Sequence, residues 1–448
     1  MLSKSRYIRG CNCNKSLWLY VHKSEEQVVS ESSAITMARG TKVGALARDF
    51  FPGGKLAVPE GFPGMESAKR TQEYIQQGVE TIYEATFIYD NTLVAVDILH
   101  KEDGKWCLYQ VKSTTKIHDK HINDIAVQYY VITGSGLPVE EAQLMFLNKK
   151  YVKHGEIEVD KLFVHENVTD RILPLQSTIK NNIPQLLSML EGEEPNVAMG
   201  TQCNKPYLCD FSEYCYKINP PDCVVQPELN NEPHVMEKEL KEYFSSIHYP
   251  VCHLDFETIM PAIPLFDESR PMQKIPFQYS LHFQETAGNE VKHSYYLATS
   301  DLKIDPRKEL IKQMIQDTKD AKTIFVYWIS FEKSRIEEMM IDFPEFRNEL
   351  QDIANRLVDL IFPFKKKIYR TETMKGSSSI KKVLPALCPE FSYDDLEIGN
   401  GMAASNAFMD LYYCSDESIK KQIRRHLLDY CHLDTYAMVK ILEVLQKF

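Results

Sequence analysis

A proline-rich seam divides this sequence into two halves. Residues 217–250 hold five prolines, a pair of adjacent asparagines and many charged residues, a composition that packed helices and strands rarely tolerate. We therefore expect an inter-domain linker with a short helix at 217–246, between one domain at 1–216 and a second at 247–448. The 448 residues are ample for two domains with separate cores.

Both halves alternate apolar strand-like segments with amphipathic helices, which predicts an α/β protein with mixed sheets flanked by helices. The predicted elements of the first half are a helix at 66–83, strands at 84–89, 93–99 and 106–113, a helix at 120–133 and a strand at 142–148. Those of the second half are strands at 251–257, 276–283, 293–298 and 323–328, and helices at 305–319 and 416–446.

Composition narrows the class of protein. Hydrophobic residues make up 44% and charged residues 26%, the balance of a globular protein and not of a collagen, a coiled coil or a disordered chain. No apolar run reaches the ~18–20 residues of a membrane span, and the N-terminus lacks the apolar stretch of a signal peptide. We expect a cytoplasmic protein without a membrane partner.

The net charge of −11 argues against a protein coated in basic charge for non-specific nucleic-acid binding. It leaves a nuclease open, because a carboxylate-rich metal site adds negative charge of its own. Residues 361–382 are locally basic, with seven Lys or Arg and one Glu.

A first group of chemistry-bearing residues lies in the predicted hairpin of the first half. Asp97 interrupts an apolar strand, where a carboxylate needs a partner, a metal or a surface. Gln110 and Lys112 are two apart and so share a face of the next strand. An acid, an acceptor oxygen and an ammonium group together suit Mg²⁺-dependent phosphodiester hydrolysis. A solvated hairpin with a salt bridge is the alternative.

Asp97, Gln110-x-Lys112 and Gln128-Tyr129-Tyr130 resemble the D…(D/E)xK…QxxxY signature of RecB-type PD-(D/E)XK nucleases. The resemblance implies a restriction-endonuclease-like core in which Asp97 and Gln110 bind metal and Lys112 is catalytic. It also implies that Gln128, with Tyr129 or Tyr130, contacts the nucleic-acid backbone. Two features depart from the pattern. Gln110 stands where the family has an acid, and residues 44–48, GALAR, lack the upstream histidine of many members.

The eleven cysteines form no obvious disulfide scaffold, since their number is odd and no export signal is seen. Cys203, Cys209 and Cys215 instead make a regular C-x5-C-x5-C array, and Cys11 and Cys13 stand near the N-terminus. Three spaced thiolates with a distant fourth suit Zn²⁺ or an iron–sulfur cluster. Unrelated core thiols are the alternative.

The cysteine pattern is similar to that of the CRISPR-associated RecB-like exonucleases and the AddB family. The resemblance implies a structural [4Fe-4S] cluster held by Cys13, Cys203, Cys209 and Cys215, with Zn²⁺ as the alternative metal. The C-K-x-x-x-L-like context of residues 13–18 favours Cys13 as the fourth ligand over Cys11. Such a cluster would close a loop of about 190 residues, which restricts the unfolded chain strongly.

A second group of acids lies in the other half. Asp255 and Glu257 share one face of the strand CHLDFET, where neighbouring carboxylates repel each other unless a cation lies between them. Tyr430 and Asp434, at i and i+4, share a helix face, and Glu332 follows the strand at 323–328. Asp359 competes with Glu332 as the middle acid, and we favour Glu332 because it follows its strand directly. Taken singly, each acid can equally be a surface residue or a helix cap.

Together these acids resemble the DxE, middle-acid and YxxxD motifs of the DnaQ-like DEDDy exonucleases. The resemblance implies an RNase H-like fold and 3′→5′ exonuclease activity, with Asp255, Glu257, Glu332 and Asp434 as metal ligands and Tyr430 positioning water. Two residues depart from the family: Glu332 replaces the usual Asp, and Trp328 stands where Asn is common.

The order of these parts resembles a bacterial family that fuses a RecB-like nuclease core, a cysteine cluster and an RNase H-like domain. The resemblance implies a Mg²⁺- or Mn²⁺-dependent nuclease acting on DNA. Lys381 and Lys382, in the basic segment, are expected to bind phosphates, with a solvated loop as the alternative. The competing functions are a nucleic-acid-binding scaffold with one or both sites inactive, and an RNA exonuclease.

Overall fold

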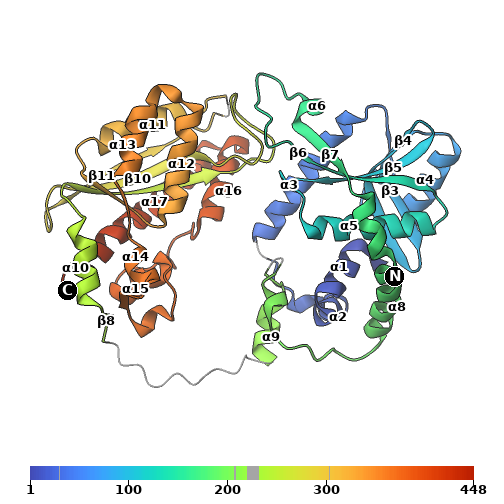
Figure 1. Ribbon diagram of the computed structural model, residues 1–448, viewed down its shortest axis with the longest axis horizontal. Helices are drawn as coiled ribbons and strands as arrows, with labels where there is room; N and C mark the ends of the chain where they lie inside the picture. Colours follow the sequence, from blue (N-terminus) through green and yellow to red (C-terminus); the bar gives the residue numbers. More distant parts are fainter. Residues whose placement is uncertain (30, 206–207, 219–231, 302) are drawn as a thin grey trace. The chain divides into compact units, whose positions relative to one another are not determined.

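The structure is a computed structural model that describes residues 1–29, 31–205, 208–218, 232–301 and 303–448, without the side chains of 31–35. It divides into two compact units (Figure 1). Unit 1 comprises Met1–Val225 with Ala262–Pro264 and Arg270–Met272, and unit 2 the rest of the chain. Residues 219–231 of the predicted linker lie outside the described residues, and its later part contains the short helix α10 (Glu237–Ser245). In the described part, no helix combines the length and the apolar character needed to cross a membrane.

Unit 1 is built on a mixed sheet in the order β2-β3-β4-β5-β6-β7, with β1 paired to β4. Its central strands β3, β4 and β5 form an antiparallel meander, and β6 joins β5 in parallel. The strands are β1 (Leu2–Ser3), β2 (Lys55–Leu56), β3 (Thr81–Tyr89), β4 (Thr92–Glu102), β5 (Lys105–Lys112), β6 (Val139–Leu147) and β7 (Phe163–Asn167).

Helices cover this sheet because apolar residues recur on one side of each. Helix α5 packs on β3, β4 and β6, with Ile125, Val131 and Ile132 fully buried in the main core of the unit. The helices of unit 1 are α1 (Lys4–Asn12), α2 (Asn14–His22), α3 (Glu31–Ala47), α4 (Met65–Gln76), α5 (Asp119–Gly134), α6 (Val159–Leu162), α7 (Thr169–Ile172), α8 (Gln176–Glu191) and α9 (Ser212–Ile218).

Unit 2 is built on a mixed sheet in the order β11-β10-β9-β12-β13. Strands β11, β10 and β9 pair antiparallel, and β12 and β13 continue the sheet in parallel. Its strands are β8 (His234–Val235), β9 (Val251–Ile259), β10 (Ile275–Gln284), β11 (Val291–Leu297), β12 (Thr323–Val326), β13 (Leu357–Asp359) and β14 (Tyr369–Arg370), of which β8 and β14 form a separate two-stranded sheet.

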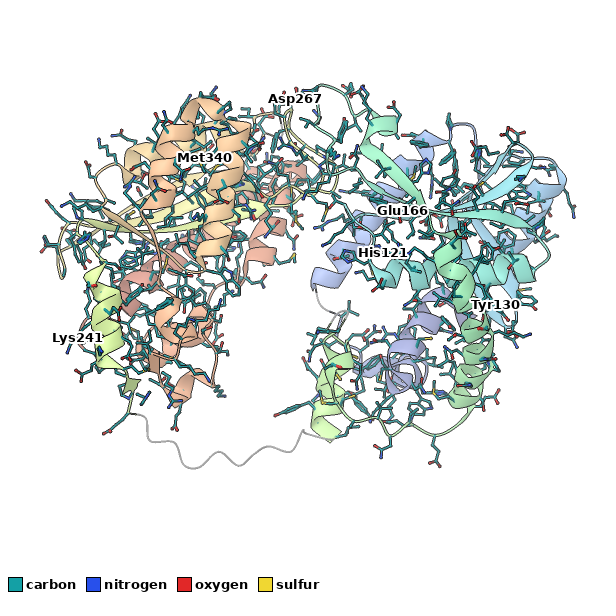
Figure 2. All side chains as sticks on the ribbon, in the orientation of Figure 1. His121, Tyr130, Glu166, Lys241, Asp267 and Met340 are labelled. Atoms are coloured by element: carbon teal, nitrogen blue, oxygen red, sulfur yellow. The ribbon has the colours of Figure 1, made fainter. Side chains whose placement is uncertain are left out.

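Each face of the unit 2 sheet has its own core because side chains alternate along a strand. Leu254 and Phe256 pack with α11 (Arg307–Thr318), α12 (Ile329–Asp342) and α13 (Arg347–Asn355). The opposite face packs with α15 (Ile380–Leu387), α16 (Gly401–Tyr413) and α17 (Glu417–Leu445). The remaining short helix is α14 (Phe362–Lys365). Side chains fill the space between sheet and helices (Figure 2).

The structure confirms the mixed α/β character and corrects one predicted element. The helix predicted at 66–83 ends at Gln76, and β3 begins at Thr81. Gly78 has φ +76°, a left-handed conformation that glycine adopts readily and that terminates helices. The other predicted strands and helices lie within a few residues of those observed.

Candidate functional site

A pocket of about 350 Å³ opens in unit 2 between the central strand β9, the residues that follow β12, and helices α12, α15 and α17. All four acids predicted for the second half contribute to its wall. The lining residues are Asp255, Phe256, Glu257, Tyr327, Trp328, Phe331, Glu332, Ile380, Lys381, Gly401, Tyr430, Asp434 and Met438.

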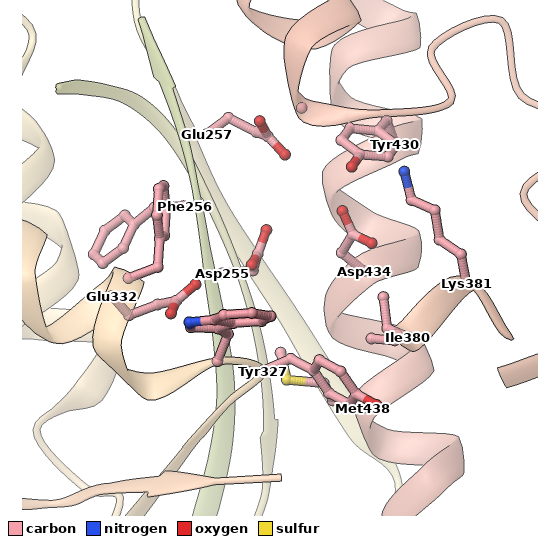
Figure 3. A pocket seen from close by; sticks show the side chains of 13 residues that line it. Asp255, Phe256, Glu257, Tyr327, Glu332, Ile380, Lys381, Tyr430, Asp434 and Met438 are labelled. Atoms are coloured by element: carbon pink, nitrogen blue, oxygen red, sulfur yellow. The ribbon is translucent and has the colours of Figure 1, made fainter. Parts of the chain in front are cut away.

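Three separate elements supply the acids. Asp255 and Glu257 project from β9 on the face that α17 covers. Leu254 and Phe256 alternate with them along the strand and point to the opposite face of the sheet, where they are buried. Asp434 projects from the middle of α17, and Glu332 from the first turn of α12. Figure 3 shows the four carboxylates directed into one space. Residues nearly 180 positions apart in the sequence thus meet in the pocket.

Burial raises the pKa of all four carboxyl groups, and Asp255 and Glu257 are raised further by their neighbours. Burial raises the pKa of Asp255 well above its usual value, and the charges of Asp434, Glu332 and Glu257 raise it further. Burial and the charge of Asp434 likewise raise the pKa of Glu257. Burial raises the pKa of Glu332 to about 8. One oxygen of Glu332, Oε2, is buried without a hydrogen-bond partner.

Asp434 is held by groups from two neighbouring segments. The hydroxyl of Tyr393 donates a hydrogen bond of 2.7 Å to its Oδ1. Burial raises the pKa of Asp434 to about 6, while Tyr393, Tyr430 and the charge of Lys381 act in the opposite direction. Lys381 itself donates to the backbone carbonyl of Gly399 and lies over the ring of Tyr430. These contacts fix the orientation of Asp434 before any ligand arrives.

This donor set fits hard divalent cations. Oxygen ligands from carboxylates are what Mg²⁺ and Mn²⁺ prefer, and a cation would relieve the repulsion that, with burial, raises the pKa values of Asp255 and Glu257. The unpartnered Glu332 Oε2 is a buried acceptor that such a cation would satisfy. Asp255, Glu257, Glu332 and Asp434 are the residues that could hold it. Cys431 adds a thiol near Asp255, at 4.0 Å from Oδ2.

Asp359, the competing middle acid, does not line the pocket. Its Oδ1 accepts hydrogen bonds from the backbone N–H groups of Trp328, at 3.0 Å, and Ile361, at 3.3 Å. Trp328 has φ +88° and 56% of its surface exposed, a strained backbone position for a large side chain. Asp359 therefore supports the turn before α12 while Glu332 enters the pocket.

A basic cavity of about 450 Å³ adjoins the carboxylate pocket along residues 364–378. Its exposed cations are Lys365, Lys367, Arg370 and Lys375, against one lining acid, Glu372. Two contacts join it to the pocket. The ammonium of Lys365 lies 5.3 Å from the ring centre of Trp328, and the hydroxyl of Tyr327 donates to the carbonyl of Ser378 at 2.7 Å.

The two lysines predicted to bind phosphate separate in the structure. Lys381 enters the carboxylate pocket from the first turn of α15. Its neighbour Lys382 is exposed and belongs to neither lining.

In unit 1, the predicted RecB-like residues meet but bond mainly to one another. The Gln110 amide donates to Asp97 Oδ2 at 2.5 Å, and the N–H of Val111 donates to the same oxygen at 2.6 Å. The Gln110 oxygen accepts from Gln128, and Lys112 donates to Asp124. The groups expected to bind a metal are thus engaged in protein hydrogen bonds.

Charges around this network are balanced. Burial raises the pKa of Asp97, while the charges of Lys4 and Lys112 lower it. Glu84 pairs with Arg48 at 3.1 Å. Beyond Gln128, Tyr129 is partly buried against the core and Tyr130 donates to Asp90 at 3.1 Å.

The four predicted cluster cysteines line one small pocket formed by the start of α2 and residues 197–203 and 209–215. Burial raises the pKa of Cys13, and the nearby thiols of Cys209 and Cys203 raise it further. Ion pairs hold the two chain segments together, with Arg9 bidentate to Asp210 and Lys15 at 3.0 Å from Glu194. Cys11 is not in this lining; its thiol contacts Asn182.

Four residues of the site carried no interpretable signal in the sequence. Tyr393 lies in a loop, and nothing in its surroundings marks it as a partner of Asp434. In the sequence, Trp328 is a departure from the DEDDy pattern and Lys365 is one charge of a basic segment, and neither feature predicts a place in the site. Cys431, in DYCHLD, adjoins the Tyr430–Asp434 pair, and that proximity was the only available clue.

One protein family matches part of unit 2, and three curated proteins match a little under half of the chain. Residues 252–379 match a family described as a domain of unknown function (DUF2779). This range holds Asp255, Glu257 and Glu332 and ends before Asp434. The chain is 30% identical over 222 residues to "Uncharacterized protein MG366 homolog" of Mycoplasma pneumoniae, which is 45% of this chain and 33% of that protein.

Two further relatives are similar at lower identity. They are "Uncharacterized protein MG366" of Mycoplasma genitalium, 27% identical over 46% of this chain and 34% of that protein, and "Uncharacterized protein UU173" of Ureaplasma parvum, 27% identical over 45% and 32%. The chain spans about a third of the length of the curated relatives it matches.

Proposed function

We propose that unit 2 is a metal-dependent exonuclease that hydrolyses DNA from the 3′ end. The observation that carries the proposal is the convergence of Asp255, Glu257, Glu332 and Asp434 on one pocket, where each carboxylate has a raised pKa. The mixed sheet flanked by helices supports the RNase H-like assignment. The family match over 252–379 is compatible with this proposal and names no activity.

Bound divalent ions would supply charge stabilisation for the attacking and leaving oxygens of phosphodiester hydrolysis. The residues of this chain do the positioning. The hydroxyl of Tyr430 faces Asp434 and orients a water molecule toward the phosphate, and Tyr393 keeps Asp434 in place. Lys381 brings a positive charge to the same wall, where it attracts the phosphate.

The basic cavity supports single-stranded nucleic acid as the substrate. A strand whose terminal nucleotide enters the carboxylate pocket would pass Trp328 and reach the four cations of the cavity. An exposed indole is a platform for base stacking, and lysines and arginines along a groove follow the phosphate backbone. Duplex DNA needs to fray before its end can follow this path.

The proposal is tested by digestion of end-labelled single-stranded and double-stranded DNA with Mg²⁺ or Mn²⁺. We expect stepwise shortening from the 3′ end, faster on single strands, and no activity in Asp255→Ala. Asp429→Asn is the matched control, since Asp429 lies on α17, faces Arg425 and is half exposed. Full activity of Asp255→Ala would overturn the assignment. Faster cleavage of an RNA strand of the same sequence would identify an RNA exonuclease instead.

For unit 1 we propose the alternative of a nucleic-acid-binding module without cleavage. The observation in its favour is that Gln110, Asp97 and Gln128 satisfy one another. Gln110→Glu supplies the missing acid and places two carboxylates in contact, which favours a cation between them. We expect Mg²⁺ to raise the melting temperature of this variant more than that of the wild type. Cleavage by unmodified unit 1 in an Asp255→Ala chain would contradict the proposal.

We further propose a structural [4Fe-4S] cluster on Cys13, Cys203, Cys209 and Cys215. All four residues line one pocket, so their thiols can serve a common metal centre. Soft thiolate ligands suit an iron–sulfur cluster and also Zn²⁺, which stays the alternative metal.

A further inference from the structure

Three histidines from three different elements of unit 2 gather beside the carboxylate pocket. His282 lies on β10, His293 directly opposite on β11, and His432 on α17. One ring nitrogen of each lies within 4.8 Å of the others. The three ring centres are 4.5–4.7 Å apart. None of these residues lines the carboxylate pocket.

A hydroxyl network fixes the orientation of the two strand histidines. The Nδ1 atom of His282 contacts the Thr435 hydroxyl at 2.8 Å, and the Nε2 atom of His293 contacts the Ser280 hydroxyl at 2.9 Å. The two hydroxyls are themselves 2.6 Å apart. Metal-binding histidines typically have one nitrogen engaged in this way, which leaves the other nitrogen as the ligand. Here that leaves Nε2 of His282 and Nδ1 of His293.

Burial favours the neutral imidazole in the two strand histidines, which is the form that binds metal. Burial, then the neighbouring histidines, lowers the pKa of His282 to about 2. Burial and His432 lower the pKa of His293 to about 4. The cluster is also accessible from solvent, since His293 and His432 are exposed whereas His282 is buried.

We propose that His282, His293 and His432 form a binding site for a first-row divalent transition metal ion, of which Zn²⁺ is the best fit. Imidazole nitrogen suits Zn²⁺, Ni²⁺ and Cu²⁺ and is a poor ligand for Mg²⁺. Three protein ligands leave a coordination position open to water or another ligand. The site therefore differs in ligand chemistry from the carboxylate pocket, and it does not rest on the proposed nuclease activity.

The test is zinc binding by the full chain at saturating Mg²⁺, which occupies the carboxylates. Bound Zn²⁺ is measured by competition with a chromophoric chelator in the wild type and in the variants His293→Ala and His432→Ala. These two histidines are chosen because they are more exposed than His282. His426→Ala, on the same α17 and outside the cluster, is the matched control. Any zinc on the cysteines is common to all four proteins and cancels in the comparison.

We expect His293→Ala and His432→Ala to lose one zinc equivalent or to bind it at least about tenfold more weakly, while His426→Ala matches the wild type. The Co²⁺-loaded wild type should show visible absorption of a nitrogen-ligated site that both cluster variants lack. Equal zinc stoichiometry and affinity in all four proteins would overturn the proposal. So would a loss confined to His426→Ala.

Discussion

The carboxylate of Asp359 accepts a hydrogen bond of 3.0 Å from the backbone N–H of Trp328, a residue held at φ +88°. This contact stabilises a turn that an L-amino acid adopts only at a cost of about 1–3 kcal/mol. The turn begins α12, directs Glu332 into the pocket and leaves the Trp328 indole exposed at its edge. Asp359 is thus a positioning residue for two groups of the site.

Asp359→Ala should lower both stability and nuclease activity, because it leaves the Trp328 N–H without its acceptor. The bond is exposed to solvent, so its loss should cost about 0.5–1.5 kcal/mol. Asp359→Asn keeps an acceptor oxygen and should recover most of both properties. Glu332→Ala should abolish activity without this loss of stability. Melting temperatures and nuclease rates are measured on the same preparations of each variant. Full activity of Asp359→Ala would contradict the positioning role.

The carboxylate pocket should make the metal-free protein less stable as the pH rises. The folded-state pKa of Glu332 is about 8, against 4.5 in a free side chain. Folding therefore favours its protonated form. The resulting stability is complete below pH 4.5 and is lost as the pH rises through about 8. Asp434 acts in the same direction between 3.8 and about 6.

Glu332→Gln isolates this contribution. In the presence of EDTA, the variant should melt at the same temperature as the wild type near pH 4.5 and at a higher temperature near pH 8. Mg²⁺ should stabilise the wild type at the higher pH by binding the ionised carboxylates. An equal difference in melting temperature between the two proteins at both pH values would contradict the pKa assignment.

Trp328→Ala should weaken binding of single-stranded DNA. Stacking of one base on an aromatic side chain contributes about 1–3 kcal/mol, so the dissociation constant should rise about 5- to 150-fold. Trp328→Phe retains a stacking surface and should lose less. Fluorescence anisotropy with a labelled oligonucleotide in Ca²⁺ measures affinity without cleavage. Tyr413→Ala, which removes an exposed aromatic elsewhere in unit 2, should leave affinity unchanged.

Cys13→Ser should lose the proposed iron–sulfur cluster, whereas Cys11→Ser should retain it. The reason is geometric, since Cys13 shares a pocket with Cys203, Cys209 and Cys215 and Cys11 lies outside that lining. Iron and sulfide content with visible absorption, measured on anaerobic preparations, distinguishes the two variants. Stoichiometric zinc without iron in the wild type would replace the cluster with a zinc site. Iron loss in Cys11→Ser alone would exchange the roles of the two cysteines.

The local sequence pattern was sufficient to predict the strands and helices that contain the site residues. The strand around Asp255 and Glu257 and the long helix around Tyr430 and Asp434 were predictable because hydrophobic periodicity follows from local backbone geometry. The same local rules placed Asp255 with Glu257, and Tyr430 with Asp434. The predicted end of the helix at 66–83 was wrong, although Gly78 stands in the sequence as a residue that commonly terminates helices.

The sequence by itself determined which side chains can bind metal and which of them share a strand or helix face. The sequence favoured Glu332 over Asp359 because Glu332 follows its strand directly, but only the tertiary structure shows that Glu332 lines the pocket while Asp359 bonds to the turn beneath it. It alone brought Tyr393 to Asp434 and three distant histidines to one place. Contacts between residues far apart in the chain depend on how sheets and helices pack, and no local pattern records that packing.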